Sequence, residues 1–246
     1  MTFWDHLDEL RGVILRVLLA TTVFSAAAFC MKDELFAVLL APTHADFVTY
    51  RFIGADGHFA LKLVNTGLTE QFMVHMRTAL YAGLLCASPY ALYAIFSFVS
   101  PGLYEKERRV GVRLAGSAYV MFVIGTLINY FIVFPLAVRF LGTYQVSPEV
   151  GNMLTLHSYI DTLLGLGLVM GIVFELPVVC WLLARAGVLT GDTMANYRRH
   201  AFVGILIAAA VITPTGDPFS LFAVTLPVYL LYEISIFITK HTQPHA

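Results

Sequence analysis

The chain has 246 residues, of which 59% are hydrophobic and only 13% are charged. A soluble domain carries about a quarter of charged residues, so this composition excludes an ordinary soluble protein and predicts an integral membrane protein. The formal net charge of -1 gives no basic field, which excludes nucleic acid as a partner.

The N-terminal residues 2–11 carry an apolar stripe at helical spacing with charged residues off the stripe. This pattern predicts a short amphipathic helix that lies on the membrane surface. The first membrane span is expected at about 13–31. Arg16, near the start of this span, is expected to extend its charge back to the headgroups.

A long polar loop is expected over residues 32–69. Within it, the Asp56-Gly57 turn signal and the alternating apolar residues that follow indicate a β-hairpin.

Five further apolar stretches are long or apolar enough to be interpreted as spans, so residues 1–246 are predicted to form a single all-α membrane domain of six transmembrane helices. The last two spans are expected to be short, because the fifth has 13 residues and Pro227 interrupts the sixth. The five stretches cover about 72–99, 114–138, 159–184, 201–213 and 219–239.

The distribution of Lys and Arg predicts the orientation. With six spans both termini share one side, and ten of the 15 Lys and Arg residues fall on that side. Basic residues gather on the cytoplasmic side of membrane proteins, so both termini are predicted to be cytoplasmic.

The sequence offers no pattern for catalysis. It has no Gly-x-Ser-x-Gly elbow and no glycine-rich phosphate loop, and its histidines lack metal-ligand spacing. Its three cysteines fall inside predicted spans, where they are interpreted as small apolar residues. No enzyme activity, metal or cofactor is therefore expected.

Four motifs occur in order along nearly the whole chain, and together they resemble the TatC family, the multi-spanning receptor subunits of the twin-arginine protein translocase. They read His6-Leu-Asp-Glu-Leu-Arg11, Phe98-x-x-Pro-Gly-Leu-Tyr-x-x-Glu107-Arg-Arg, Phe174-Glu-Leu-Pro177, and Thr213-Pro-x-x-Asp217 with Pro227-Val-Tyr229-x-x-x-Glu233.

This resemblance implies a receptor that moves folded proteins with a paired-arginine signal peptide across the bacterial cytoplasmic (inner) membrane, driven by the proton-motive force. It implies as partners those signal peptides, the small single-span subunits TatA and TatB or a TatA-like equivalent, other copies of the chain and the lipid bilayer. The implied signal-peptide residues are Glu9, Arg11, Phe98, Pro101, Leu103 and Glu107.

The chemistry of two acids suits this role. Arginine presents a planar fork of donors that pairs with a carboxylate, and Glu9 together with Glu107 could accept two adjacent guanidinium groups. The alternative is that Glu107 pairs within the protein with Arg108, Arg109 or Arg11.

A second set of polar residues lies in or beside the later spans. Glu175 is a single acid inside the fourth span, between glycines and Pro177, where an ionised carboxylate is costly. The resemblance implies that Asp217, Tyr229 and Glu233 contact partners or act in translocation. A proton-coupled small-solute transporter that uses Glu175 is the alternative function, although no internal repeat supports it.

Overall fold

A computed structural model describes residues 3–52, 61–99, 108–145, 147, 153–213 and 217–242. The described chain is almost entirely helical, and it forms two compact units. Unit 1 comprises residues 1–40 and 67–120, and unit 2 comprises residues 41–66 and 121–246.

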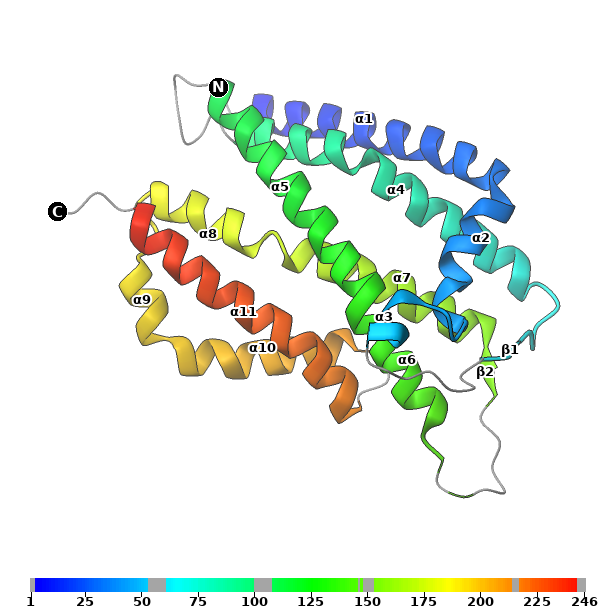
Figure 1. The fold of residues 1–246 in the computed structure, drawn as a ribbon. Coiled ribbons are helices and arrows are strands. Elements are labelled where there is room, and N and C mark those ends of the chain that lie inside the picture. Colours follow the sequence, from blue (N-terminus) through cyan, green and yellow to red (C-terminus); the bar gives the residue numbers. More distant parts are fainter. Residues whose placement is uncertain are drawn as a thin grey trace. The chain divides into compact units, whose positions relative to one another are not determined.

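Unit 1 is built on a pair of long helices, α1 and α4, which lie side by side and are the most extensively packed pair of described elements (Figure 1). Gly83 permits this close approach because it has no side chain. A Cβ atom at this position would clash with α1, at 2.1 Å from Ser25 Oγ and 2.5 Å from the Ser25 backbone nitrogen. The helices of this unit are α1 (Phe3–Cys30), α2 (Lys32–Leu40), α4 (Glu70–Val99) and the first part of α5 (Arg108–Ile128).

The predicted surface helix and first span are one continuous helix, so the prediction of two elements was wrong. Gly12 lies at the expected boundary, but a single glycine is not enough to end a helix. The apolar run after it contains no stop signal, so the helix continues. Arg16 Nε donates to the Gly12 carbonyl at 3.0 Å, so this side chain folds back towards the N-terminus of the helix.

Helix α4 contains Pro89 and continues through it. A proline has no backbone N–H, so the Leu85 carbonyl four residues earlier loses its usual donor. The Ser88 hydroxyl donates to this carbonyl at 2.6 Å. A hydroxyl on the same helix therefore replaces the missing backbone bond.

Unit 2 holds the remaining elements. They are η1 (Ala41–Thr43), α3 (Val48–Phe52), β1 (Leu63–Val64), the π-helical segment η3 (Asn129–Val133), α6 (Phe134–Thr143), β2 (Leu154–Thr155), α7 (Leu156–Val173), α8 (Leu176–Arg185), α9 (Gly191–Asn196), α10 (Arg198–Ile212) and α11 (Pro218–Thr242).

The predicted β-hairpin within residues 32–69 is not what the described part of this loop forms. Strand β1 pairs in parallel with β2, which puts Leu63 opposite Leu154 and Val64 opposite Thr155. Parallel strands cannot be joined by a tight turn, so the partner comes from another loop. The Asp56-Gly57 turn lies outside the described residues.

Pro135 changes the helix that contains it. The segment η3 directly before α6 is a π-helix, in which the Phe134 N–H donates to the Asn129 carbonyl five residues back. Pro135 has no N–H to donate to the Phe131 carbonyl. The Thr49 hydroxyl, from α3 in the long loop, donates to that carbonyl instead.

Tyr50 adds to the attachment of α3. Its hydroxyl donates to the Pro42 carbonyl at 2.9 Å and lies 3.3 Å from the Pro135 carbonyl oxygen. Burial raises the pKa of Tyr50 to about 12, although the nearby Arg139 charge acts in the opposite direction. The hydroxyl therefore keeps its proton, and the loop segment is fastened to the end of the spanning helix.

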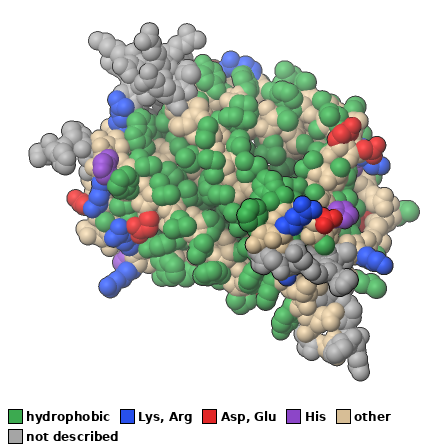
Figure 2. Space-filling model, viewed as in Figure 1, with side chains coloured by type: hydrophobic (Ala, Val, Ile, Leu, Met, Phe, Trp, Pro, Cys, Tyr) green, Lys and Arg blue, Asp and Glu red, His purple; other side chains and the backbone are tan. Residues whose placement is uncertain are grey.

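Five helical stretches among the described residues are long and apolar enough to cross a membrane. Hydrophobic side chains cover most of the surface that Figure 2 shows, with charged side chains in small groups. The stretches are Leu7–Cys30, Glu70–Phe98, Leu114–Thr143, Leu156–Arg185 and Pro218–Thr242.

The last two helices differ in length. Helix α10 has 15 residues, about 22 Å at 1.5 Å per residue, which agrees with the predicted short fifth span. Helix α11 has 25 residues, so the prediction of a short sixth span was wrong. Pro227 lies inside α11 without ending it, and the helix continues through Lys240 and His241 to Thr242.

The core of unit 2 gathers around Met170 and Phe174 near the end of α7. Two glycines allow α5 to approach it. A Cβ atom at Gly125 would lie 2.6 Å from the Met170 carbonyl oxygen, and one at Gly171 would lie 2.6 Å from the Phe122 ring. The α5–α7 crossing thus fixes the residues immediately before Glu175.

We expect Gly83→Ala to destabilise the protein by about 1–3 kcal/mol, because its methyl group would overlap the backbone of α1 at Ser25. Gly116→Ala is the matched control, since a Cβ atom there meets nothing within 4 Å. Thermal unfolding in detergent measures both variants. Equal stability of the two would contradict the close packing of α1 on α4.

We expect Thr49→Val to destabilise the protein by about 1–3 kcal/mol, because it leaves the Phe131 carbonyl without its hydroxyl donor. Pro135→Ala restores a backbone N–H, so Thr49→Val should cost less in that background. A double-mutant cycle by thermal unfolding measures the coupling. Identical costs in both backgrounds would show that the hydroxyl does not replace the missing N–H.

Candidate functional site

Two of the predicted signal-peptide residues lie in the first turns of α1. Glu9 and Arg11 are both exposed, and neither forms an ion pair with any described residue. Residues two apart on a helix do not face each other, which explains why this pair does not form. The Glu9 carboxylate is therefore not occupied by Arg11.

Phe98 lies near the end of α4 and lines an apolar groove together with residues of α1 that follow Glu9. The structure thus brings Phe98 and the start of α1 together within unit 1. The other predicted members of the site, Pro101, Leu103 and Glu107, lie outside the described residues.

Glu175 lies where the fourth spanning stretch is interrupted. Helix α7 ends at Val173 and α8 begins at Leu176, with Phe174 and Glu175 in a turn between them. Pro177 contributes to the interruption because it lacks the N–H that would bond the Val173 carbonyl. The spanning helix is therefore interrupted at Glu175.

The carboxyl group of Glu175 is isolated. Both of its oxygens are buried, and neither has a hydrogen-bond partner among the described residues. Its backbone is well bonded, since the Glu175 carbonyl accepts from the N–H groups of Val178 and Val179. The turn is therefore fixed while the carboxyl group is available to a donor or acceptor from elsewhere.

Tyr229 and Glu233 are one turn apart on α11 and form a polar cluster with a third residue. Arg198, at the start of α10, donates to Glu233 Oε2 at 2.8 Å, and the Tyr229 hydroxyl donates to Oε1 at 3.1 Å. The Tyr229 ring also meets the Phe202 ring edge to face at 5.4 Å. Both oxygens of Glu233 are therefore engaged within the chain.

Asp217 has a separate structural role. Its carboxylate accepts from the Ser220 N–H at 2.7 Å, which caps the N-terminus of α11. The structure therefore does not place it in the polar cluster of Arg198, Tyr229 and Glu233.

Sequence reasoning missed Arg198 as a site residue, because it used this arginine only to orient the chain. The spacing of Tyr229 and Glu233 at i and i+4 could have indicated their contact. No sequence signal links Arg198 to them across 35 residues. Further contacts hold the neighbouring α9, since Lys240 pairs with Asp192 at 2.9 Å.

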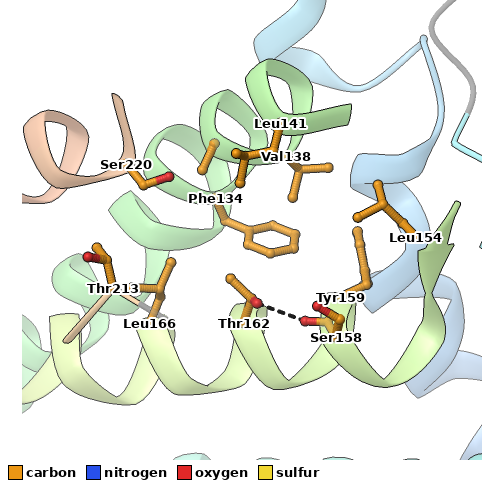
Figure 3. Close-up of a pocket in the computed structure, with 11 residues that line it drawn as sticks. Phe134, Val138, Leu141, Leu154, Ser158, Tyr159, Thr162, Leu166, Thr213 and Ser220 are labelled. Atoms are coloured by element: carbon orange, nitrogen blue, oxygen red, sulfur yellow. Dashed lines mark hydrogen bonds between the residues drawn. The ribbon is translucent and has the colours of Figure 1, made fainter. Parts of the chain in front are cut away.

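Unit 2 contains a small cavity of about 50 Å³, which is lined mainly by side chains of α6, α7 and α11 (Figure 3). The Thr162 and Thr213 hydroxyls on its wall donate to the carbonyls of Ser158 and Ala209. The cavity holds no acid or base, and its volume suits one or two water molecules. It is not a site for chemistry.

Among the described residues there is no group of three His, Cys, Asp or Glu side chains that could hold a metal ion. The cysteines Cys30, Cys86 and Cys180 are free.

The fold and these residues define a multi-pass, all-α membrane protein with an exposed acid at one helix start and a buried acid at a helix break. The family model of the Sec-independent protein translocase protein (TatC) matches residues 5–227. The chain belongs to the TatC family. It is a transport component rather than an enzyme, and this assignment favours the translocase over the small-solute transporter.

Individual relatives agree over nearly the full length. The chain is 35% identical to TatC of Carboxydothermus hydrogenoformans, over 99% of this chain and 95% of that protein. It is 34% identical to TatCy of Bacillus subtilis, over 98% of this chain and 89% of that protein. A crystal structure of the twin arginine translocase receptor TatC superposes with a TM-score of 0.80 at 32% identity, covering 96% of this chain and 99% of that one.

We expect Arg198→Glu to weaken the packing of α10 on α11 by up to about 1 kcal/mol, because it replaces a partly exposed ion pair with two like charges. Adding Glu233→Arg should restore the pair and the stability. Arg199→Glu is the matched control, since this exposed neighbour forms no ion pair with a described residue. Thermal unfolding in detergent measures the set, and no recovery in the swapped pair would contradict a direct interaction.

Proposed function

We propose that the chain is the receptor for paired-arginine signal peptides in the twin-arginine translocase, and that Glu9 and Glu107 bind the two guanidinium groups. The observation that supports this is that Glu9 is exposed and forms no ion pair with a described residue, in a chain of the TatC family whose Phe98 contacts the same groove as Leu10, the next residue of α1. Near the headgroups such ion pairs are stronger than in open water, because fewer water molecules screen them. Arg11, Pro101 and Leu103 complete the proposed site.

The proposed receptor has six spans in a single membrane domain, with both termini in the cytoplasm. The short helix α10 is the proposed fifth span, although it falls below the length of the other five. Because it reaches only about 22 Å, the bilayer would thin beside it to match. The proposed location is the bacterial inner membrane, and the proton-motive force is the proposed source of energy.

The proposed partners are cargo signal peptides, further copies of the chain and the single-span subunits TatA and TatB. We assign contact with these subunits to Tyr229 and Glu233 on α11 and to Asp217, which lies directly before this helix. Glu175 supports a further contact, because its buried and unpaired carboxyl group suits a polar residue on an approaching helix.

We expect Glu107→Lys to abolish binding of a paired-arginine peptide and Glu9→Ala to weaken it by about 1.5–3 kcal/mol, the cost of a lost charged hydrogen bond. A paired-lysine peptide, which cannot form the same forked contacts, should bind more weakly to the unmodified chain. Glu34→Ala, at an exposed acid in α2, is the control. Peptide titration with chain in nanodiscs measures these affinities, and unchanged binding in both Glu9 and Glu107 variants would overturn the assignment.

We expect Glu175→Ala to reduce transport and Glu175→Gln to retain it, because the amide keeps the hydrogen-bonding shape of the buried carboxyl group. Transport of a folded cargo into membrane vesicles measures this, with membrane insertion of each variant checked in parallel. Equal loss in both variants would instead indicate a proton-coupled role. Full activity of the Ala variant would show that Glu175 has no part in transport.

A further inference from the structure

Helix α3 exposes two large apolar side chains. Val48 and Phe52 are four residues apart, so they share one face of this helix. Their exposed fractions are 53% and 88%. The rest of α3 is fixed to the protein, because the Thr49 and Tyr50 hydroxyls bond carbonyl oxygens of the third spanning stretch. The helix is therefore attached through its hydroxyl groups and leaves its apolar side chains exposed.

The attachment points give the depth of α3 in the membrane. The uncharged part of the third spanning stretch begins at Leu114 and ends before Arg139. The carbonyls of Phe131 and Pro135, to which α3 is bonded, lie about 26 Å and about 32 Å from Leu114 at 1.5 Å per residue. The hydrocarbon core of a bilayer is about 30 Å thick. Helix α3 thus lies beside the start of α6, at the level where this stretch leaves the hydrocarbon core (Figure 1).

The span exposes apolar side chains at the same level. Phe131 and Ile132 have exposed fractions of 38% and 50%. Phe47, which directly precedes α3, stacks on the Phe131 ring with a centroid distance of 5.8 Å. An exposed apolar patch marks a contact with a membrane or a protein. Here the patch adjoins the surface of a spanning helix, which lipid covers.

The charged residues of this segment pair with each other. Arg51 lies 3.7 Å from Asp46, and the two side chains are 66% and 92% exposed. An arginine next to a large apolar residue suits the level of the lipid headgroups, because its aliphatic stem can lie along lipid while its guanidinium group reaches water. Helices that lie in the membrane interface combine an apolar face with basic residues in this way.

We propose that α3 is a membrane anchor that inserts Val48 and Phe52 between the phospholipids at this boundary. Part of the loop over residues 32–69, which the sequence predicted to be polar, then lies among the headgroups and the upper acyl chains instead of in water. Burial of apolar surface in lipid provides the driving force. This anchoring is independent of signal-peptide binding, so either one can fail without the other.

Fluorescence quenching in nanodiscs that hold one copy of the chain tests this anchor, because a second copy cannot cover α3 there. Both native tryptophans, Trp4 and Trp181, are replaced by phenylalanine. Phe52→Trp then reports on α3, and Tyr144→Trp is its matched control. Tyr144 is also an aromatic residue with a large exposed fraction, 60%, but it lies about 13 Å beyond Pro135 at 1.5 Å per residue.

We expect lipids that carry bromine near the headgroup end of the acyl chain to quench Phe52→Trp, whereas Tyr144→Trp keeps its intensity. Lipids that carry bromine at the chain ends should quench Phe52→Trp less, because α3 lies at the boundary of the bilayer and not at its centre. Ile132→Trp, on the surface of the span, is the positive reference. Equal quenching of Phe52→Trp and Tyr144→Trp would overturn the inference.

Thiol labelling provides a second measurement without an added indole ring, since tryptophan itself favours the membrane interface. In a chain whose three cysteines are replaced by serine, Phe52→Cys should react with a water-soluble maleimide more slowly than Tyr144→Cys, because a thiol in lipid forms little thiolate. Unfolding in detergent should make the two rates equal. Equal rates in the nanodisc, or a difference that persists after unfolding, would contradict insertion of α3.

Discussion

Backbone carbonyl groups that lose their helical donor must find another one inside a membrane, where water cannot replace it. Pro89 and Pro135 each create such a carbonyl, and the hydroxyls of Ser88 and Thr49 satisfy them. The first hydroxyl comes from the same helix, whereas the second comes from a loop helix 82 residues away in the chain. The second replacement therefore also attaches α3 to the spanning helix.

Two acids of unit 2 differ in how their carboxyl groups are bonded near or inside the membrane. Both oxygens of Glu233 are engaged, by Arg198 and Tyr229, so this acid stabilises the contact between α10 and α11. Both oxygens of Glu175 are buried without a partner among the described residues. An unsatisfied buried polar group carries a free-energy cost that a partner would remove, so Glu175 is the acid suited to an incoming group.

In unit 1 the exposed Glu9 and the apolar groove both belong to one tight helix pair. Gly83 lets α4 approach the backbone of α1 at Ser25, and this pairing also brings Ile95 and Phe98 to the turns of α1 that follow Glu9. The acid is on the surface, whereas the apolar side chains line a groove between the two helices. An exposed acid and an apolar groove thus lie on neighbouring turns of α1.

The sequence alone determined the membrane class, most of the spanning stretches and the short α10, because the length of an apolar run is a local property. Motif resemblance also named Glu9 and Phe98 as signal-peptide residues, and that role stays a prediction. It failed where distant residues decide the outcome. The parallel pairing of Leu63 with Leu154, the Thr49 contact with the Phe131 carbonyl and the Arg198 pair with Glu233 each join segments far apart in the chain. Local propensity carries no information on such partners, so only the tertiary structure decided them.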